Sequence, residues 1–307
     1  MSSIPRVLVG LISHNRFDYT KDALSHIVRT KLPFDILVVD CGSDADTKKG
    51  VFDLTHEAGG RFVSIENRNC NGARDIINHY GLYYDYVVYT DNDALPPPGW
   101  LDAIVDAGQS TRAALIGVPQ VGAGNDAPMF LGTFETPYEG LIVFREWGEP
   151  LREVQRLDWV TGNCMAVRGS FLRGVWEKYR LWERWKKFPI DLDDIDLAMM
   201  AKALREAVVA APIVVPQNRS PQDNRADDSY RLDRDDFHNY ALSCVSFWNE
   251  WRCNPLLNWN SGYTAKNYKP GRIYDASLAR EFGGLVEMVR EHAPGVYETL
   301  RRKLADN

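Results

Sequence analysis

Apolar runs alternate with amphipathic stretches over the first hundred residues of the chain. The runs are typical of buried strands, most clearly "RVLVGLIS", whose continuous apolar character fits a strand covered on both faces. The stretches between them place apolar residues at helical spacing. Strands are predicted at 6–13, 35–43, 61–67 and 85–93, and helices at 17–30, 44–60 and 72–84. This alternation predicts a mainly parallel sheet with helices on both faces.

The rest of the chain has a less regular pattern. Three prolines and a glycine at 96–99 argue against a helix directly after the fourth strand. A long loop rich in glycine, proline and aromatic residues is predicted at 122–140, and a polar linker at 218–236. Further strands are predicted at 113–121, 141–149, 158–172 and 210–218, and helices at 189–207, 237–253 and 276–292.

Composition narrows the class of protein. The chain has 307 residues and a formal net charge of −6, which disfavours non-specific binding to nucleic acid or to an anionic membrane surface. Its five cysteines are scattered and never spaced as CxxC, so a reducing compartment is the simpler interpretation. No stretch reaches the roughly 18 apolar residues that span a bilayer, and the first residues lack the features of a signal peptide. We therefore expect a cytoplasmic protein.

Polar or glycine-rich residues follow four of the predicted strands. They lie at Ser13–Arg16, which includes Asn15, at Asp40–Ser43, at Asn67–Arg74 and at Asp91–Asp93. In open α/β sheets, ligands bind outside the carboxyl ends of the strands. We therefore expect these segments to meet at one edge of the sheet and to form a ligand site there.

The stretch "TDND" places Asp91 and Asp93 directly after an apolar strand. Two carboxylates one residue apart can converge on a single divalent cation, and their hard oxygen atoms suit Mg²⁺ or Mn²⁺. The alternative is a solvated Asp/Asn turn, which is common before proline. The position at the end of a buried strand favours the metal site.

The stretch "DLDDIDL" gathers four acidic residues, Asp191, Asp193, Asp194 and Asp196. Acidic residues often cap helix N-termini, and this alternative explains one or two of them. Four such charges repel one another, which favours a raised pKa or a nearby metal. A carboxylate with a raised pKa beside a cleft is a candidate general base.

The loop "NRNCNGARD" has features of a phosphate-binding segment. Gly72 permits close approach of the backbone, and Arg74 offers a two-pronged cation at the start of a helix. Tryptophans in "LWERWKKF" can stack on sugars or bases, although most tryptophans belong to the core.

Six stretches in this order resemble family 2 glycosyltransferases with the GT-A fold: "SHNR", "ILVVDCGS", "NRNCNGARD", "YVVYTDND", "WVTGNCMAVR" and "WERWKKFPIDLDDIDLAMMAKAL". The resemblance spans about Arg6 to Gln217. It implies a GT-A catalytic domain at 1–220, with a nucleotide-binding half at 1–100 and an acceptor half at 101–220. A polar linker and a helical extension would form 221–307.

The resemblance also implies an activity and its residues. The enzyme would transfer a sugar from a nucleotide-diphosphate donor of the UDP, dTDP or GDP type to an acceptor hydroxyl, with inversion and with Mn²⁺ or Mg²⁺. On the donor side, it assigns nucleotide binding to Asn15, Arg16, Asp40, Gly72, Arg74 and Asp91, and the metal to Asp93 and Asp91. It assigns the role of general base to Asp194. It assigns contacts with the donor sugar or the acceptor to Gly162, Asn163, Trp182, Trp185, Asp193 and Asp196.

The chain departs from the family pattern at two places. Cys41 stands where a second aspartate is usual, and Asn218 stands near the position at which many relatives have a metal-binding histidine. His238 is a candidate replacement, although a lone histidine on an aromatic helix is more often structural.

Several functions stay open at this point. The acceptor is a glycan, a protein, a small molecule or a modified DNA base, and the basic segment at 263–275 is a candidate nucleic-acid groove or a solvated loop. A nucleotidyltransferase shares a similar core but usually has a glycine-rich phosphate loop after the first strand, which "GLISHNRFD" lacks. A GT-A-like binding module without turnover is the remaining alternative.

Overall fold

The computed structural model describes residues 4–121, 151–189, 192–218, 237–255, 276–295 and 297–298. It also gives the backbone of three short strands at 128–130, 133–135 and 143–145. The predicted linker at 218–236, apart from residue 218, and the basic segment at 263–275 lie outside the described residues.

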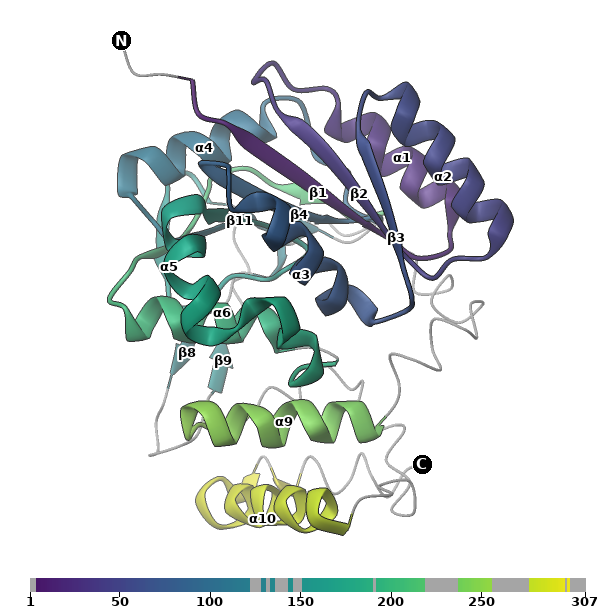
Figure 1. Ribbon diagram of the computed structural model, residues 1–307. Helices are drawn as coiled ribbons and strands as arrows, with labels where there is room; N and C mark the ends of the chain where they lie inside the picture. Colours follow the sequence, from purple (N-terminus) through teal and green to yellow (C-terminus); the bar gives the residue numbers. More distant parts are fainter. Residues whose placement is uncertain are drawn as a thin grey trace.

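A central sheet of eight strands forms the middle layer (Figure 1). Its strand order is β10-β12-β5-β11-β4-β1-β2-β3. The strands are β1 (Val7–Ser13), β2 (Asp35–Cys41), β3 (Arg61–Ile65), β4 (Tyr86–Asp91), β5 (Leu115–Gly117), β10 (Gln155–Leu157), β11 (Cys164–Arg168) and β12 (Val208–Ala210). The first four are parallel, whereas β11 lies antiparallel between β4 and β5. β10 also pairs antiparallel with β12, so the prediction of a mainly parallel sheet is confirmed with two antiparallel strands, β11 inside the sheet and β10 at its edge.

Helices cover both faces of the sheet. Alternate residues of β1 point to opposite sides: Val7, Val9 and Leu11 pack in one apolar cluster, and Leu8 and Ile12 in the other. The first cluster contains α1 (Phe17–Ile27), α2 (Ala45–Glu57) and α4 (Trp100–Thr111), and the second contains α3 (Asn69–Gly81), α5 (Gly169–Tyr179) and α6 (Asp193–Ala203). A short 3₁₀ helix, η1 (Leu181–Lys186), connects α5 to the segment before α6.

Two helices differ from the sequence predictions. As expected from the Pro-Pro-Pro-Gly stretch, no helix directly follows β4, but α4 begins at Trp100 immediately after that stretch and is not among the predicted helices. Gly99 ends the turn with a positive φ of 80°, which glycine adopts without strain. The strand predicted at 158–172 ends at Arg168, and α5 starts at Gly169. The buried residues Phe171, Leu172, Val175 and Trp176 recur at helical spacing there.

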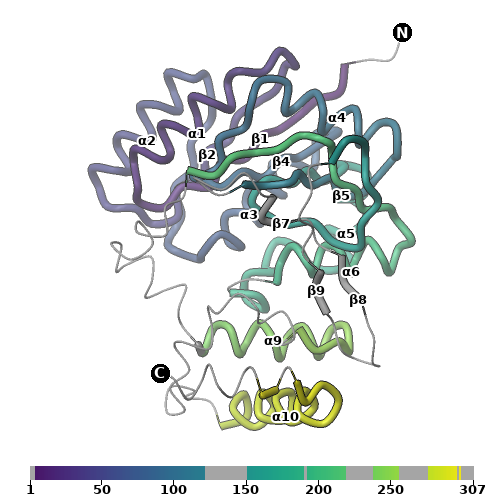
Figure 2. The backbone as a smooth tube through the Cα atoms, turned by 180° about the vertical axis from the view of Figure 1, so that it is seen from behind, coloured from purple at the N-terminus to yellow at the C-terminus, as the bar shows by residue number. Residues whose placement is uncertain are grey.

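The C-terminal helices form an additional layer next to α6 (Figures 1 and 2). They are α9 (Phe237–Trp251) and α10 (Ala276–His292), as predicted. Buried residues of both, including Phe247 and Phe282, belong to the same apolar cluster as α3, α5 and α6. The extension therefore shares a core with the sheet.

Short strands complete the described part of the chain. β6 (Gln120–Val121) lies between β13 (Val215–Pro216) and β7 (Pro128–Phe130), and β8 (Thr133–Glu135) pairs with β9 (Val143–Arg145). The predicted loop at 122–140 thus contains two strands. None of the helices in the described ranges is long and apolar enough to cross a membrane.

Candidate active site

The carboxyl ends of β1 to β4 lie along one edge of the sheet. Across the parallel pairs, Ser13 lies opposite Asp40, Ile12 opposite Asp91, and Asp40 opposite Ser64. The strands are in register at their ends, so the residues that follow them share this edge. This edge is the candidate site, because ligands of open α/β sheets bind there.

Asp40 is fully buried at the end of β2. The Ser64 hydroxyl donates a hydrogen bond to Asp40 Oδ2 over 3.0 Å, and Oδ1 has no hydrogen-bond partner among the described residues. A buried acceptor without a donor is costly, so Oδ1 is suited to accept a hydrogen bond from a ligand. Burial raises the pKa of the neighbouring Cys41 thiol, so Cys41 is neutral and does not replace the second acid of the family pattern.

The turn after β1 is fastened to the loop after β2. Asn15 and Arg16 both have positive φ, 47° and 51°. The Asn15 backbone N–H donates to Ser43 Oγ over 2.8 Å, and Asn15 Oδ1 accepts the Asp44 N–H over 3.1 Å. The Arg16 guanidinium lies over the Tyr19 ring. Asn15 thus holds two loops together beside Asp40, and its side-chain oxygen already has a donor.

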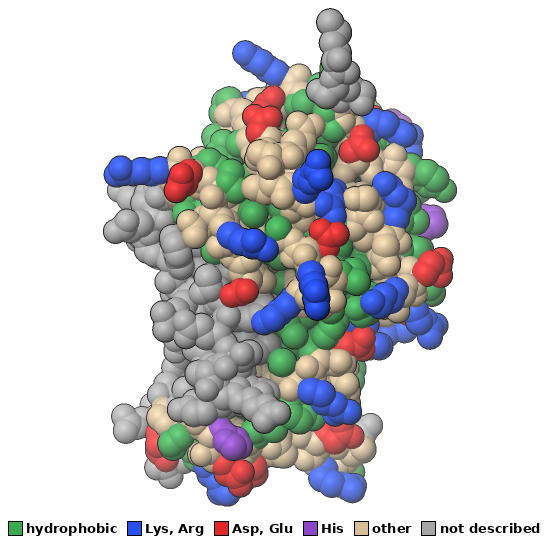
Figure 3. Space-filling view, turned by 90° about the vertical axis from the view of Figure 1, so that its left-hand side faces the viewer, with side chains coloured by type: hydrophobic (Ala, Val, Ile, Leu, Met, Phe, Trp, Pro, Cys, Tyr) green, Lys and Arg blue, Asp and Glu red, His purple; other side chains and the backbone are tan. Residues whose placement is uncertain are grey.

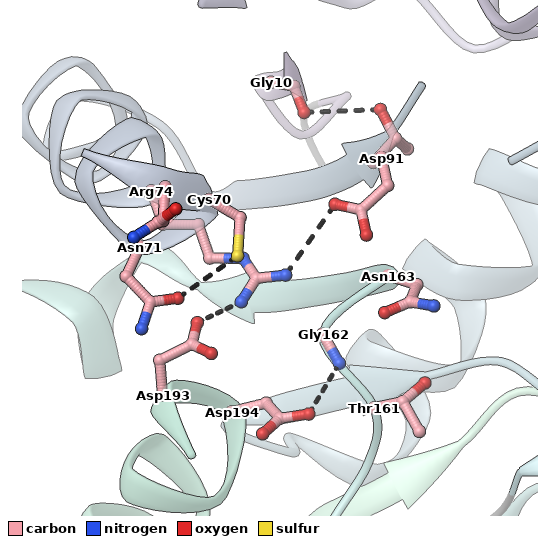
Figure 4. Close-up of polar contacts among 12 residues, drawn as sticks. Gly10, Cys70, Asn71, Arg74, Asp91, Thr161, Gly162, Asn163, Asp193 and Asp194 are labelled. Atoms are coloured by element: carbon pink, nitrogen blue, oxygen red, sulfur yellow. Dashed lines mark hydrogen bonds and ion pairs between the residues drawn. The ribbon is translucent and has the colours of Figure 1, made fainter. Parts of the chain in front are cut away.

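Arg74 connects the two acidic stretches (Figure 4). Its buried guanidinium forms an ion pair with Asp193 and lies 3.8 Å from Asp91 Oδ1. A β-carbon at Gly162 would lie 2.7 Å from Arg74 Nη2, so glycine leaves the space that the guanidinium fills. At Gly72 a β-carbon would overlap the Cβ of Arg68. Both predicted glycines therefore permit close packing around α3.

Asp91 and Asp93 lie where β4 ends, and Asp93 is 5% exposed. The segment at 215–218 fixes this turn: the Asn218 N–H donates to the Asp93 carbonyl over 2.7 Å, and Ala94 pairs with Gln217. His238 lies in α9, and the described ranges contain no group of three or more His, Cys, Asp or Glu side chains that could hold a metal ion. At the end of β4, the Asp-Asn-Asp stretch contributes two carboxylates, those of Asp91 and Asp93.

Asp194 lies in the first turn of α6 and contacts the loop before β11. The Gly162 N–H donates to Asp194 Oδ2 over 2.9 Å, and the Ile195 N–H donates to Oδ1 over 2.8 Å. Burial of the carboxyl group and the negative charge of Asp193 raise the pKa of Asp194 to about 7, although Arg74 and the two N–H groups oppose the shift. A carboxyl with this pKa can exchange a proton near neutral pH.

Asp196 is placed differently from Asp194. It is 1% exposed and accepts two hydrogen bonds from Arg184, over 2.7 and 2.6 Å. The Trp251 indole N–H donates to the same carboxylate over 2.7 Å. Asp196 is two positions after Asp194, and residues at this spacing are about 200° apart around a helix axis. Asp194 contacts Gly162, so Asp196 faces away from Gly162. The structure does not bring it together with Asp194. Asp191 lies outside the described residues.

The two predicted tryptophans have different surroundings. The backbone N–H of Trp185 donates to Asp75 Oδ2 over 3.3 Å, and the Arg68 guanidinium lies 4.9 Å from the centre of the Trp185 ring. Arg68 directly precedes α3, so Trp185 lies beside the end of α3 that carries Arg74. Trp182 is 39% exposed and packs on Trp176, with ring centres 5.6 Å apart. Its contacts are with α5 rather than with the acidic cluster.

Sequence reasoning missed a buried amide cluster behind the Asp-Asn-Asp turn. Asn163 Nδ2 donates to Gln120 Oε1 over 3.2 Å, Gln217 Nε2 donates to the same oxygen, and Gln120 Nε2 donates to Thr161 over 3.2 Å. The signal for Gln120 was a polar residue at the end of the apolar run "AALIGVPQV". The cluster joins the loop at 161–163 to the segment that fixes Asp93.

The chain resembles known proteins in sequence family and in fold. Residues 8–180 match the family model described as glycosyl transferase family 2. S. aureus TarS 1-349 in complex with UDP-GlcNAc superimposes with a TM-score of 0.54 at 11% identity, covering 98% of this chain and 88% of that one. The mannosyltransferase PcManGT from Pyrobaculum calidifontis, in complex with GDP-Man and Mn²⁺, gives 0.50 at 16% identity, covering 99% and 84%.

GalNAc-T7 with UDP, GalNAc and Mn²⁺ gives a TM-score of 0.55 at 12% identity, covering 84% of this chain and 56% of that chain. No curated protein sequence matches the chain at a significant level. The three solved structures are too distant in sequence to indicate more than the fold.

Proposed function

The chain belongs to glycosyl transferase family 2, and from this premise we propose that it is an inverting, metal-dependent transferase of a sugar from a nucleotide diphosphate. The observation that carries the proposal is the position of Arg74. This buried cation joins Asp91, at the end of β4, to Asp193, beside Asp194 in α6. A candidate diphosphate site and a candidate base are thereby held in one cluster.

The nucleotide would bind along the ends of β1 to β4. Asp40 Oδ1 is buried without a hydrogen-bond partner among the described residues, which fits recognition of a nucleobase N–H. Gly72 lies in the first turn of α3, whose N-terminus favours an anion such as a phosphate. Asn15 and Arg16 would border this site through the turn that they form.

A divalent cation fits the oxygen atoms at the end of β4. Asp93 and Asp91 would hold Mn²⁺ or Mg²⁺, since these cations prefer carboxylate oxygens and commonly complete their shell with phosphate oxygens and water. Both carboxylates lie where β4 ends, and Asp93 is 5% exposed, so the cation would be held at this edge of the sheet. When bound, the cation would stabilise the negative charge of the leaving diphosphate. Two of the similar folds were solved with Mn²⁺, which supports this choice.

Asp194 would act as the general base. In its ionised form it takes the proton of the acceptor hydroxyl while that oxygen forms a bond to the anomeric carbon of the sugar. The bond from this carbon to the diphosphate oxygen breaks, and its electron pair leaves with the phosphate. A single displacement of this kind inverts the anomeric centre. The N–H groups of Gly162 and Ile195 would keep the carboxylate in a fixed orientation.

The sugar would lie beside the Arg74 cluster and the loop at 161–163, which pack against each other at Gly162. Gly162 and Asn163 belong to this loop, and Trp185 of η1 would border the sugar. The contacts of Trp182 with Trp176 favour a packing role for Trp182. The acceptor stays open among glycans, proteins and small molecules. Figure 3 shows basic and acidic side chains interspersed over one face of the molecule, so that face offers no continuous basic surface for nucleic acid.

A thermal-shift experiment tests the proposal. UDP, dTDP, GDP and CMP are each added with and without Mn²⁺, and the melting temperature is measured. We expect one diphosphate to raise Tm by several degrees only with Mn²⁺, because a ligand at about 100 times its Kd stabilises the native state by about 2.7 kcal/mol. Asp93→Asn should remove the Mn²⁺ dependence. If no nucleotide raises Tm, the protein does not bind a nucleotide sugar and the proposal is wrong.

A further inference from the structure

Asp196 is the centre of a buried ionic cluster that joins three elements. Arg184 of η1 donates two hydrogen bonds to it, and Trp251 of α9 donates a third over 2.7 Å. Glu250 of α9 lies 3.6 Å from Arg184 and 2.7 Å from Lys187. The last two residues of α9 are thus fastened to η1 and to α6.

The same helix turn carries the candidate base. Asp194 and Asp196 are two residues apart, and the Asp196 N–H donates to the Leu192 carbonyl over 2.8 Å to close the first turn. An α-helical turn is stiff, so a rotation of the Asp196 side of α6 also moves Asp194. The Asp194 carboxylate needs a fixed position, because it contacts the Gly162 N–H on the other side of the helix.

Both oxygen atoms of the buried Asp196 carboxylate need hydrogen-bond donors. A carboxylate that is 1% exposed is stable in its ionised form only when its oxygen atoms have donors. Arg184 supplies one donor to each oxygen, and Trp251 supplies a second donor to Oδ1. The Trp251 ring also packs near Tyr179, with ring centres 5.8 Å apart, so its N–H is held in one orientation.

We propose that Trp251 is a positioning residue: through Asp196 and Arg184 it fixes the first turn of α6 and thereby the orientation of Asp194. This inference rests on the proposed transferase function. It assigns the C-terminal extension a part in catalysis, with α9 as a brace for the helix that carries the base. Neither Trp251 nor Glu250 contacts the Arg74 cluster directly, so their effect on nucleotide binding should be small.

The test compares Trp251→Phe with Trp248→Phe. Phenylalanine keeps an aromatic ring at position 251 but removes the N–H that Asp196 accepts. Trp248 lies one turn earlier in α9 and packs against the same apolar cluster, which makes it a matched control. We expect Trp251→Phe to lower kcat about tenfold, since small displacements of a catalytic group are costly. The donor KM and the Tm shift with nucleotide should stay within twofold of the wild-type values.

Hydrogen exchange gives a readout that does not depend on activity. We expect the amides of the first turn of α6 to exchange faster in Trp251→Phe and at the wild-type rate in Trp248→Phe. Should Trp251→Phe fail to fold, Glu250→Gln removes the other contact of α9 and should lower kcat in the same direction.

Three results decide the question. An unchanged kcat in Trp251→Phe, or an equal loss in Trp248→Phe, overturns the proposal. If the wild-type protein transfers no sugar, the proposed function fails, and hydrogen exchange alone decides whether Trp251 positions this turn. Unaltered exchange of α6 in Trp251→Phe would then overturn the inference as well.

Discussion

The two sides of the candidate site are built in different ways. On the donor side, Asp40 and Asp91 lie at the ends of strands of one sheet and Asp93 follows the second strand, and parallel pairing brings these strand ends to the same edge. On the base side, Asp193 and Asp194 begin a helix whose orientation depends on side-chain pairs with α3, η1 and α9. Backbone topology positions the first group, whereas ionic and hydrogen-bonded contacts position the second. The base side should therefore be the more sensitive to single substitutions at a distance from the ligand.

The largest effect on kcat is expected when the candidate base, Asp194, loses its ability to take up a proton. Asp194→Asn keeps the size of the side chain, but the amide cannot take the proton from the hydroxyl of the acceptor substrate. We therefore expect kcat to fall by about 10³-fold. The Tm shift produced by donor nucleotide with Mn²⁺ should be unchanged, because the donor side does not include this carboxylate. Transfer rates and Tm are measured for this variant and for Asp46→Asn, whose exposed carboxylate lies in the first turn of α2. Full transfer activity of Asp194→Asn would remove it from the role of base.

Arg74→Met should damage both sides at once, which makes it the sharpest test of their separation. It leaves the carboxylates of Asp193 and Asp91 without their shared cation, and breaking a buried pair costs about 3–5 kcal/mol. Denaturant unfolding measures this loss. Nucleotide binding and kcat should both decrease.

The control for Arg74→Met is Arg29→Met, which alters an exposed arginine after α1 and should change the unfolding free energy little. Normal nucleotide binding by Arg74→Met would mean that Arg74 belongs to the base side alone.

The sequence predicts the positions of the donor-side residues better than those of the base-side residues. The positions of Asp40 and Asp91 follow from strand order, because alternating apolar and amphipathic stretches already predict which ends share an edge. The partners of Asp193 and Asp196 do not follow from such patterns. Arg74 is 119 residues from Asp193, and Trp251 is 55 residues from Asp196, so each pair depends on the packing of helices. The start of α4 after three prolines was also hidden, since the turn residues there outweigh the helical spacing that follows.

Gly162→Ala tests the contact at which the two sides meet. The added β-carbon would lie 2.7 Å from Arg74 Nη2, and the guanidinium cannot move freely because it is buried between two carboxylates. We expect kcat/KM to fall about tenfold, in line with the cost of a small displacement of catalytic groups.

The matched control is Gly174→Ala in α5, where a β-carbon meets nothing within 4 Å. This change should leave activity unaltered and raise the unfolding free energy by about 0.5–1 kcal/mol, since alanine favours the helix. Equal activities of the two alanine variants would show that Arg74 does not need its present position.

The smallest effect on transfer is expected at Asp75, which joins α3 to η1 behind the base side and whose titration acts on stability. Burial raises the pKa of Asp75 to about 8, although the hydrogen bond that it accepts from the Trp185 backbone N–H opposes the shift. The native state therefore keeps a proton that the unfolded chain releases above about pH 4. The resulting stability is present at low pH and is lost as the pH rises to about 8, by roughly 1 kcal/mol per pH unit.

Asp75→Asn keeps an acceptor for the Trp185 backbone N–H but does not titrate. Its unfolding free energy should therefore fall less steeply between pH 5 and pH 8 than that of the wild type. The expected difference between the two slopes is about 1 kcal/mol per pH unit. Denaturant unfolding at several pH values measures the two slopes, and Asp106→Asn, which alters an exposed acid of α4, should keep the wild-type slope. Identical slopes for Asp75→Asn and the wild type would mean that Asp75 is ionised in the native protein. The base side would then hold one more negative charge, and Arg74 would have to balance it together with Asp193 and Asp91.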